Sequence, residues 1–320
     1  MRAMQPLCKT AKLKRQRTAA LQDLSEARSC RGNEAVRATK RNRLVISAAT
    51  RIWSAASSAA FIIFLFLCLP LFAVEPLIHA HAHNDYEHKR PLLDALDHGF
   101  CSVEADIYLV NGHLLVAHNV TQVKPERTLQ ALYLEPLRQR VKQNGGRVFR
   151  GGPEFTLLID LKTNWSAIYP PLRSVLKEYS DILTTFQGDS IRTNAVRAII
   201  TGDRSKEMFA GETVRYAAFD GELPELDSSD PPSLVPWISS NWTKSFRWNG
   251  SGPMQMVEVL KLRNMVRRAH EQGRRVRFWG APDKADFWRE MIALEVDLIN
   301  TDDLEGLRNF FEERKPKQSP

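Results

Sequence analysis

Short apolar runs of strand length alternate with amphipathic helical patterns over most of this 320-residue chain. Apolar residues recur at every second position in the first kind of run and at every third or fourth in the second, which are the periods of strands and helices. Such alternation predicts a parallel sheet with crossover helices. The predicted strands cover residues 77–83, 101–108, 155–162, 196–202, 216–219, 236–239, 275–279 and 297–301.

Eight parallel strands within about 235 residues favour a TIM-like (β/α)8 barrel over an open sheet. We expect this barrel to occupy residues 76–315. Helical patterns between the fourth and seventh strands are short or missing, so the barrel should be irregular. A hairpin-like piece is expected at 113–118, and the predicted helices cover 91–98, 129–143, 169–183, 254–272, 285–294 and 304–314.

The positive charge of the chain is concentrated before the barrel. The net charge is +8, but residues 1–75 carry thirteen Arg and Lys against four Asp and Glu, so the remaining 245 residues sum to −1. A nucleic-acid-binding face would lie on the folded domain itself, so we expect no nucleic acid partner. Cys101 is the only cysteine after residue 75, which excludes a disulfide framework and a thiolate zinc site in the barrel.

An apolar segment separates the basic arm from the barrel. Residues 1–51 predict a disordered cytosolic arm, and the uncharged run within 52–74 is long enough for a transmembrane signal anchor. Basic residues before this run and Glu75 after it would send the barrel into a secretory or vacuolar lumen or outside the cell. Four glycosylation sequons favour that compartment and a glycoprotein. A cleaved leader and a mitochondrial presequence with an anchor are the alternatives.

Two carboxylates share one face of the second predicted strand. In SVEADIY, Glu104 and Asp106 alternate with apolar residues, and Asp160 ends the next strand in LLID. Inward-facing carboxylates are costly in a barrel unless they are paired or bind a metal. Three carboxylates suit Mg²⁺ or Ca²⁺ better than zinc. A solvated strand face is the alternative interpretation.

Seven of the eight histidines fall between residues 77 and 119. His79, His81 and His83 alternate on the first strand, and the one nearest its end should reach the site. This favours His83, with His81 second. His118 follows the strand-like LLVA near the carboxylates, so we expect it to be catalytic as well. Histidine titrates near neutral pH and can exchange protons with a substrate.

Lys162 lies two residues after Asp160 and shares its face. An ammonium group there would neutralise charge that builds up on phosphate oxygens. A surface lysine that extends into solvent is the alternative.

These residues together resemble the superfamily of phosphatidylinositol-specific phospholipase C and glycerophosphodiester phosphodiesterases. The sequence HAHNDY…PLLDAL…VEAD…LLVAHN is most similar to the fungal altered inheritance of mitochondria protein 6 branch, and DLKT is similar to spider-venom sphingomyelinase D. The resemblance implies a histidine ending strand 1, Glu-x-Asp on strand 2, a second histidine and an acid-x-Lys on strand 3. Matching positions are His83 or His81, Glu104, Asp106, His118, Asp160 and Lys162.

The resemblance implies a metal-dependent phosphodiester hydrolase that uses two histidines as acid and base on a lipid-derived or glycerophospho-type diester. Asn84, Arg204 and Trp279 are expected to line the head-group pocket. The chain departs from glycerophosphodiesterases at His83-Asn84-Asp85, where they carry His-Arg-Gly, so an arginine that would touch phosphate is missing. The rival hypotheses are an inactive membrane-tethered barrel that binds a ligand and a zinc amidohydrolase-like enzyme.

Overall fold

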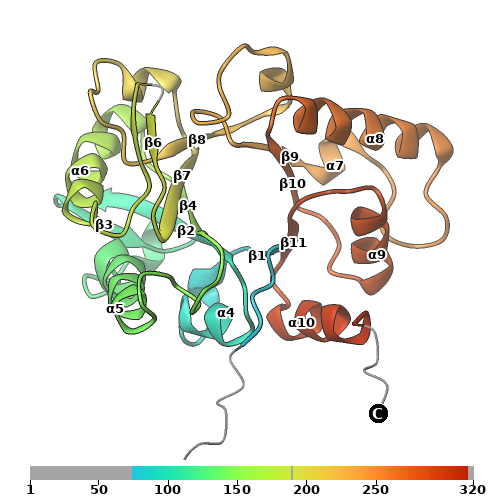
Figure 1. The fold of residues 1–320 in the computed structure, drawn as a ribbon, viewed down its shortest axis with the longest axis horizontal. Coiled ribbons are helices and arrows are strands. Elements are labelled where there is room, and N and C mark those ends of the chain that lie inside the picture. The colour runs from blue at the N-terminus through green and yellow to red at the C-terminus, as the bar shows by residue number, and fades with distance from the viewer. Residues whose placement is uncertain (1–73, 189, 316–320) are drawn as a thin grey trace, which may run out of the picture. The chain divides into compact units, whose positions relative to one another are not determined.

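Eight parallel strands form the centre of the molecule (Figure 1). The structure is a computed structural model that describes residues 74–188 and 190–315. Neighbouring strands follow the order β10-β9-β8-β7-β4-β2-β1-β11. Their bounds are β1 Ala80–Ala82, β2 Ser102–Val110, β4 Phe155–Leu161, β7 Val196–Gly202, β8 Ala218–Gly221, β9 Trp237–Asn241, β10 Arg275–Trp279 and β11 Ile299–Thr301.

The two end strands of this sheet meet only at one bridge, between Arg277 of β10 and Leu298 just before β11. The ring is therefore a nearly closed barrel, which confirms the predicted barrel. The predicted hairpin is β3 (His113–Val116), which pairs antiparallel with β2. A second hairpin, β5 (Thr185–Gln187) with β6 (Ser190–Arg192), was not predicted, because its strands are three residues long and mostly exposed.

Helices cover the outside of the barrel, with α4, α5 and α6 on one side of Figure 1 and α8, α9 and α10 on the other. The connections from β7 to β8 and from β8 to β9 contain only short 3-10 helices, η4 (Lys206–Phe209) and η5 (Leu223–Asp227), so the expected irregularity is confirmed. The other helices are η1 Asp85–Glu87, α4 Leu93–Asp97, η2 Val120–Gln122, the π-helical η3 Gln130–Leu134, α5 Glu135–Gln143, α6 Trp165–Glu178, α7 Trp242–Ser245, α8 Met256–Glu271, α9 Ala285–Ala293 and α10 Leu304–Glu313.

A small apolar cluster fills the lower part of the barrel interior. It contains Leu158 of β4, Ile199 of β7 and Trp237 of β9, together with Phe186, Ala218 and Leu298. Side chains alternate along a strand, so Asp160 follows Leu158 on the same inward face but nearer the carboxyl end. The interior is thus apolar at its base and polar at its mouth.

The larger apolar core lies between the strands and the surrounding helices, and its buried residues run from Leu77 to Phe310. Residues 74–188 and 190–315 belong to one compact unit by their own contacts. A unit with a complete core of its own is expected to fold as an independent chain.

No helix within residues 74–188 and 190–315 has the length and hydropathy needed to cross a membrane. The predicted arm at 1–51 and nearly all of the predicted anchor at 52–74 lie outside the described residues. The anchor, its orientation and the compartment stay predictions from sequence.

Gly202 at the end of β7 shapes the wall beside Asp160, and alanine there should be strongly destabilising. Its φ is +79°, and a Cβ would overlap Asp160 Oδ1 and lie 2.5 Å from the Leu161 carbonyl oxygen. Gly211 is a matched control, because its φ is +75° and a Cβ there meets nothing within 4 Å. We expect Gly211→Ala to lose roughly 1–2 kcal/mol for the left-handed backbone alone, and Gly202→Ala at least about 2 kcal/mol more.

Urea unfolding of both variants measures this difference. Equal losses at the two glycines would show that the wall beside Asp160 is not tightly packed.

Candidate active site

A cavity of about 780 Å³ opens at the carboxyl ends of the strands. Barrels of this kind carry their chemistry at that end. Every residue that the sequence assigned to the site lines the cavity except His81. Those lining it are His83, Asn84, Glu104, Asp106, His118, Asp160, Lys162, Arg204 and Trp279.

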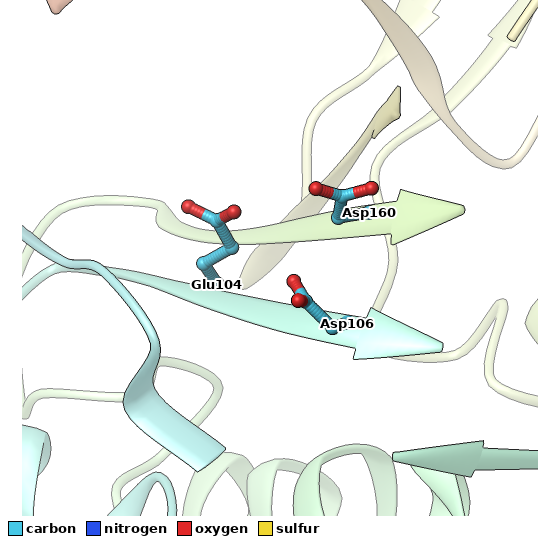
Figure 2. Close-up of side chains that lie close together, drawn as sticks. All are labelled: Glu104, Asp106 and Asp160. Carbon is cyan, nitrogen blue, oxygen red and sulfur yellow. The ribbon is translucent and has the colours of Figure 1, made fainter. Parts of the chain in front are cut away.

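Three carboxylates converge on one point of this cavity. Asp106 of β2 is directly paired in register with Asp160 of β4, and Glu104 lies two residues earlier on β2. Figure 2 shows the three side chains pointing to the same side of the two strands. Each offers an oxygen atom, and these atoms lie within 4.8 Å of one another. The expected convergence of Glu104, Asp106 and Asp160 is therefore present.

The carboxylate cluster fits a divalent cation. Asp106 Oδ1 is buried and has no hydrogen-bond partner within the described part of the chain. Burial and repulsion by Glu104 and Asp160 raise the pKa of Asp106 to about 7. Burial and the charge of Glu104 likewise raise the pKa of Asp160. A hard cation held by carboxylate oxygens would supply both the missing partner and the missing charge, and Mg²⁺ or Ca²⁺ has that preference.

Lys162 neutralises part of the same cluster. Its Nζ lies 2.8 Å from Asp160 Oδ2 and 3.0 Å from Asp106 Oδ2. Burial opposes the charged amine, but the two carboxylates outweigh it and raise the pKa of Lys162. These two contacts hold Lys162 in the cavity wall, whereas a free surface lysine would extend into solvent.

A buried arginine that sequence reasoning missed pairs with Glu104. The side chain of Arg277 on β10 is 3% exposed, and its Nη1 lies 2.9 Å from Glu104 Oε2. Its Nε donates to Ser239 Oγ at 3.1 Å. Burial alone would raise the pKa of Glu104, but the charge of Arg277 is the main cause that holds it well below its usual range. Alternation in RVRFW puts Arg277 on the same strand face as Trp279, so the sequence pattern could have identified Arg277 as a site residue.

His81 lies behind the cavity wall. Its Nε2 accepts from Arg277 Nη1 at 2.8 Å, and its Nδ1 lies 2.7 Å from Ser102 Oγ. Burial and Arg277 lower the pKa of His81 to about 4. Both ring nitrogens are therefore engaged, and the imidazole is kept neutral. Of the two histidines that the sequence left open, the structure places only His83 in the cavity.

His83 follows β1 and is oriented by an acid from the end of β11. Its Nδ1 lies 2.9 Å from Asp302 Oδ1. Asn84 Nδ2 donates to the same oxygen at 3.2 Å. Burial disfavours the protonated ring, but the hydrogen bond to Asp302 and the charges of Glu104 and Asp302 together outweigh it and raise the pKa of His83.

His118 follows β3 and is held by Tyr86. Tyr86 is part of the HAHNDY motif, but the sequence did not predict a role for it. The Tyr86 hydroxyl lies 3.0 Å from His118 Nδ1 and donates to Asp106 Oδ2 at 2.6 Å. The two rings also stack, with centroids 6.3 Å apart. Each cavity histidine is thus fixed through Nδ1, and no hydrogen bond from the described residues occupies Nε2 of either ring.

The loop that carries His83 and Tyr86 is anchored from below by Asp85. The Asp85 Oδ2 accepts from Leu92 N at 2.6 Å and from the Tyr133 hydroxyl at 2.9 Å. Burial raises the pKa of this carboxyl to about 7. These two bonds join Asp85 to the residue before α4 and to the buried Tyr133 of η3.

The far wall of the cavity contains the expected pocket residues. Arg204 donates through Nε to the Asp220 carbonyl at 2.7 Å and through Nη1 to the Gly202 carbonyl at 3.0 Å. Trp279 is 39% exposed at the rim. Asp220 is buried and accepts from Ser239 Oγ at 2.7 Å, a position that strand patterning did not single out.

Comparison with known proteins agrees with this arrangement. A family model described as AIM6-like phosphodiesterase domain matches residues 72–220, and one described as Glycerophosphoryl diester phosphodiesterase family matches residues 275–305. Altered inheritance of mitochondria protein 6 of Eremothecium gossypii is 30% identical over 273 residues, covering 74% of this chain and 70% of that protein. The chain belongs to the altered inheritance of mitochondria protein 6 family.

Within this family, a homolog from Arthroderma benhamiae is 28% identical over 265 residues, covering 73% of this chain and 84% of that protein. Among solved structures, a glycerophosphodiester phosphodiesterase from Agrobacterium tumefaciens aligns at 15% identity with a TM-score of 0.45, covering 74% of this chain and all of that one. The first family match contains His83, the three carboxylates, His118 and Lys162, and the second contains Arg277.

The buried pair of Arg277 and Glu104 gives a stability prediction for this family member. Arg277→Met should lose roughly 3–5 kcal/mol, because Glu104 would be left buried without its cation. Adding Glu104→Gln should recover much of that loss, because the uncompensated charge is then gone. The measurement is the free energy of unfolding in urea with divalent ions chelated. Strictly additive losses in the double variant would contradict the pairing.

Proposed function

We propose that this protein is a divalent-cation-dependent phosphodiesterase that hydrolyses a lipid-derived or glycerophospho-type diester. The observation that carries the proposal is one cavity that holds a three-carboxylate cluster, Lys162 and two histidines, whose Nε2 atoms have no hydrogen-bond partner within the described residues. The family matches to phosphodiesterase descriptions support the same reaction class.

In this proposal Glu104, Asp106 and Asp160 hold the cation. When bound, it would withdraw negative charge from the phosphate oxygens. Lys162 lies against the same carboxylates and stabilises charge that develops on the phosphorane. Arg277 restrains Glu104 from behind, so its second oxygen is the one left for the cavity.

The two histidines divide the proton transfers. We assign the general acid to His83, because the hydrogen bond to Asp302 and the nearby carboxylate charges raise its pKa and keep the ring protonated to higher pH. Its Nε2 would give a proton to the departing alcohol oxygen. His118 would accept a proton at Nε2, from water or from a neighbouring substrate hydroxyl, while Tyr86 holds Nδ1.

The cavity residues support a zinc amidohydrolase less well than a phosphodiesterase. Such a site needs further histidine ligands, and within the described residues the cavity is lined by two histidines, His83 and His118. His270 lies on α8 and pairs with Asp297 at 2.8 Å instead. The proposal also includes a membrane tether through residues 52–74 and a lumenal or extracellular location, with the mitochondrion as the alternative. These parts rest on the sequence alone.

Turnover of a generic phosphodiester with Mg²⁺ or Ca²⁺ tests the proposed function. His83→Ala and His118→Ala should each lower kcat by about 10²–10⁴-fold, because each removes one proton transfer. His113→Ala is the matched control, since His113 is exposed at the start of β3. Chelation should abolish turnover, and the added cation should restore it.

An unchanged rate in His118→Ala would contradict the assigned base. Binding of a diester without turnover under either cation would favour the inactive binding barrel.

A further inference from the structure

The first two turns of α8 carry three large apolar side chains in solvent. Met256 and Val257 are each 68% exposed, and Leu260 is 57% exposed. Residues three and four apart are neighbours on a helix, so Leu260 lies beside both of the others. We call these three residues the α8 patch.

Packing of the helix does not account for the α8 patch. The opposite face of α8 buries Leu262, Val266 and Ala269 against the barrel. Farther along the helix the outward positions are polar, at Arg263, Asn264 and Arg267. Other exposed large apolar residues on the described surface, such as Ile78, Val120 and Ile191, are scattered singly. A cluster at one end of an otherwise ordinary helix indicates a contact surface.

Basic side chains surround the α8 patch. Between residues 242 and 265 the chain carries four cations and one acid, although residues 76–320 together sum to −1. The acid is Glu258, whose carboxylate accepts the backbone N–H groups of Arg247 at 2.6 Å and Trp248 at 3.3 Å. Within the described residues, no ion pair involves Lys244, Arg247 or Arg263. Their charges are therefore available to an anionic surface.

The α8 patch adjoins the mouth of the candidate active site. Lys261, next to Leu260, donates through Nζ to the Ser245 carbonyl at 2.7 Å. Ser245 and Lys244 line the cavity. Asn241 and Trp279, the last residues of β9 and β10, also line it. A surface that met the patch would lie next to the cavity opening.

We propose that the α8 patch and its basic surroundings dock the barrel onto an anionic lipid surface, so that the diester substrate is drawn from that surface. The substrate part rests on the proposed function. Interfacial binding has two contributions. Apolar side chains insert beside the lipid headgroups, and basic residues face anionic lipids. A stable protein partner would bury about 800 Å² on each side. Three exposed apolar side chains form a smaller patch, which suits insertion into a lipid surface.

Vesicle co-sedimentation of residues 73–320 tests the docking. This unit contains the complete barrel core and omits the apolar segment, which would partition into lipid by itself. We expect binding to phosphatidylcholine vesicles that contain anionic phosphatidylserine, and weaker binding without the anionic lipid. Met256→Asp with Leu260→Asp should weaken binding at least about tenfold. Ile191→Asp is the matched control, since Ile191 is an exposed apolar residue on β6.

Arg247→Glu with Arg263→Glu is a second, independent variant that leaves the apolar residues in place. It should weaken binding to anionic vesicles and have little effect on neutral ones. Thermal unfolding identifies any variant that fails to fold. Equal vesicle binding by wild type and both double variants, or no binding by wild type, would overturn the docking. Sedimentation velocity showing that the patch variant loses only self-association would instead assign the patch to contact between copies.

Kinetics separate this inference from the proposed function. The Met256→Asp/Leu260→Asp variant should hydrolyse a water-soluble diester at the wild-type rate and a vesicle-borne diester about tenfold more slowly. If this variant matched the wild-type rate on both the water-soluble and the vesicle-borne diester, the docking alone would be overturned. Absence of turnover on every diester would overturn the proposed function, while vesicle binding would still decide the docking.

Discussion

Three carboxylates within 4.8 Å of one another in a barrel interior repel each other, and the surrounding structure compensates for that repulsion. Arg277 pairs with one oxygen of Glu104, and Lys162 pairs with one oxygen of Asp106 and one of Asp160. This leaves Asp106 Oδ1 buried without a partner within the described residues. A divalent cation would complete such an arrangement, since two fixed positive charges do not balance three acids and the pKa of Asp106 is raised.

The rest of the cavity depends on this cluster. The apolar base around Leu158 and Trp237 closes the barrel from below, so polar side chains gather at the mouth. Tyr86 connects the cluster to His118 by bonding both Asp106 and the imidazole. Asp302, from the opposite end of the chain, orients His83 by a hydrogen bond to Nδ1. The α8 patch lies outside this machinery and joins it through the Lys261 contact with Ser245.

The sequence predicted the barrel and the convergence of most candidate residues on one cavity, because alternation along a strand determines which face each side chain occupies. That rule placed Glu104 with Asp106 and linked Asp160 with Lys162. It could not separate His81 from His83, which share a face; the strand ends at Ala82, so only His83 enters the cavity. Arg277 followed the same alternation, but its partner Glu104 is 173 positions away along the chain, a distance that no local pattern reports. Helix α6 begins at Trp165, earlier than expected, because Asn164 accepts from Ser166 N as its cap.

Anomalous diffraction from crystals grown with Mn²⁺ tests the central claim most directly, because manganese accepts the same oxygen ligands as magnesium and scatters anomalously. We expect one strong peak in the cavity with Glu104, Asp106 and Asp160 as its protein ligands. A cavity without manganese in crystals that bind it elsewhere, or a peak that excludes two of the three carboxylates, would contradict it.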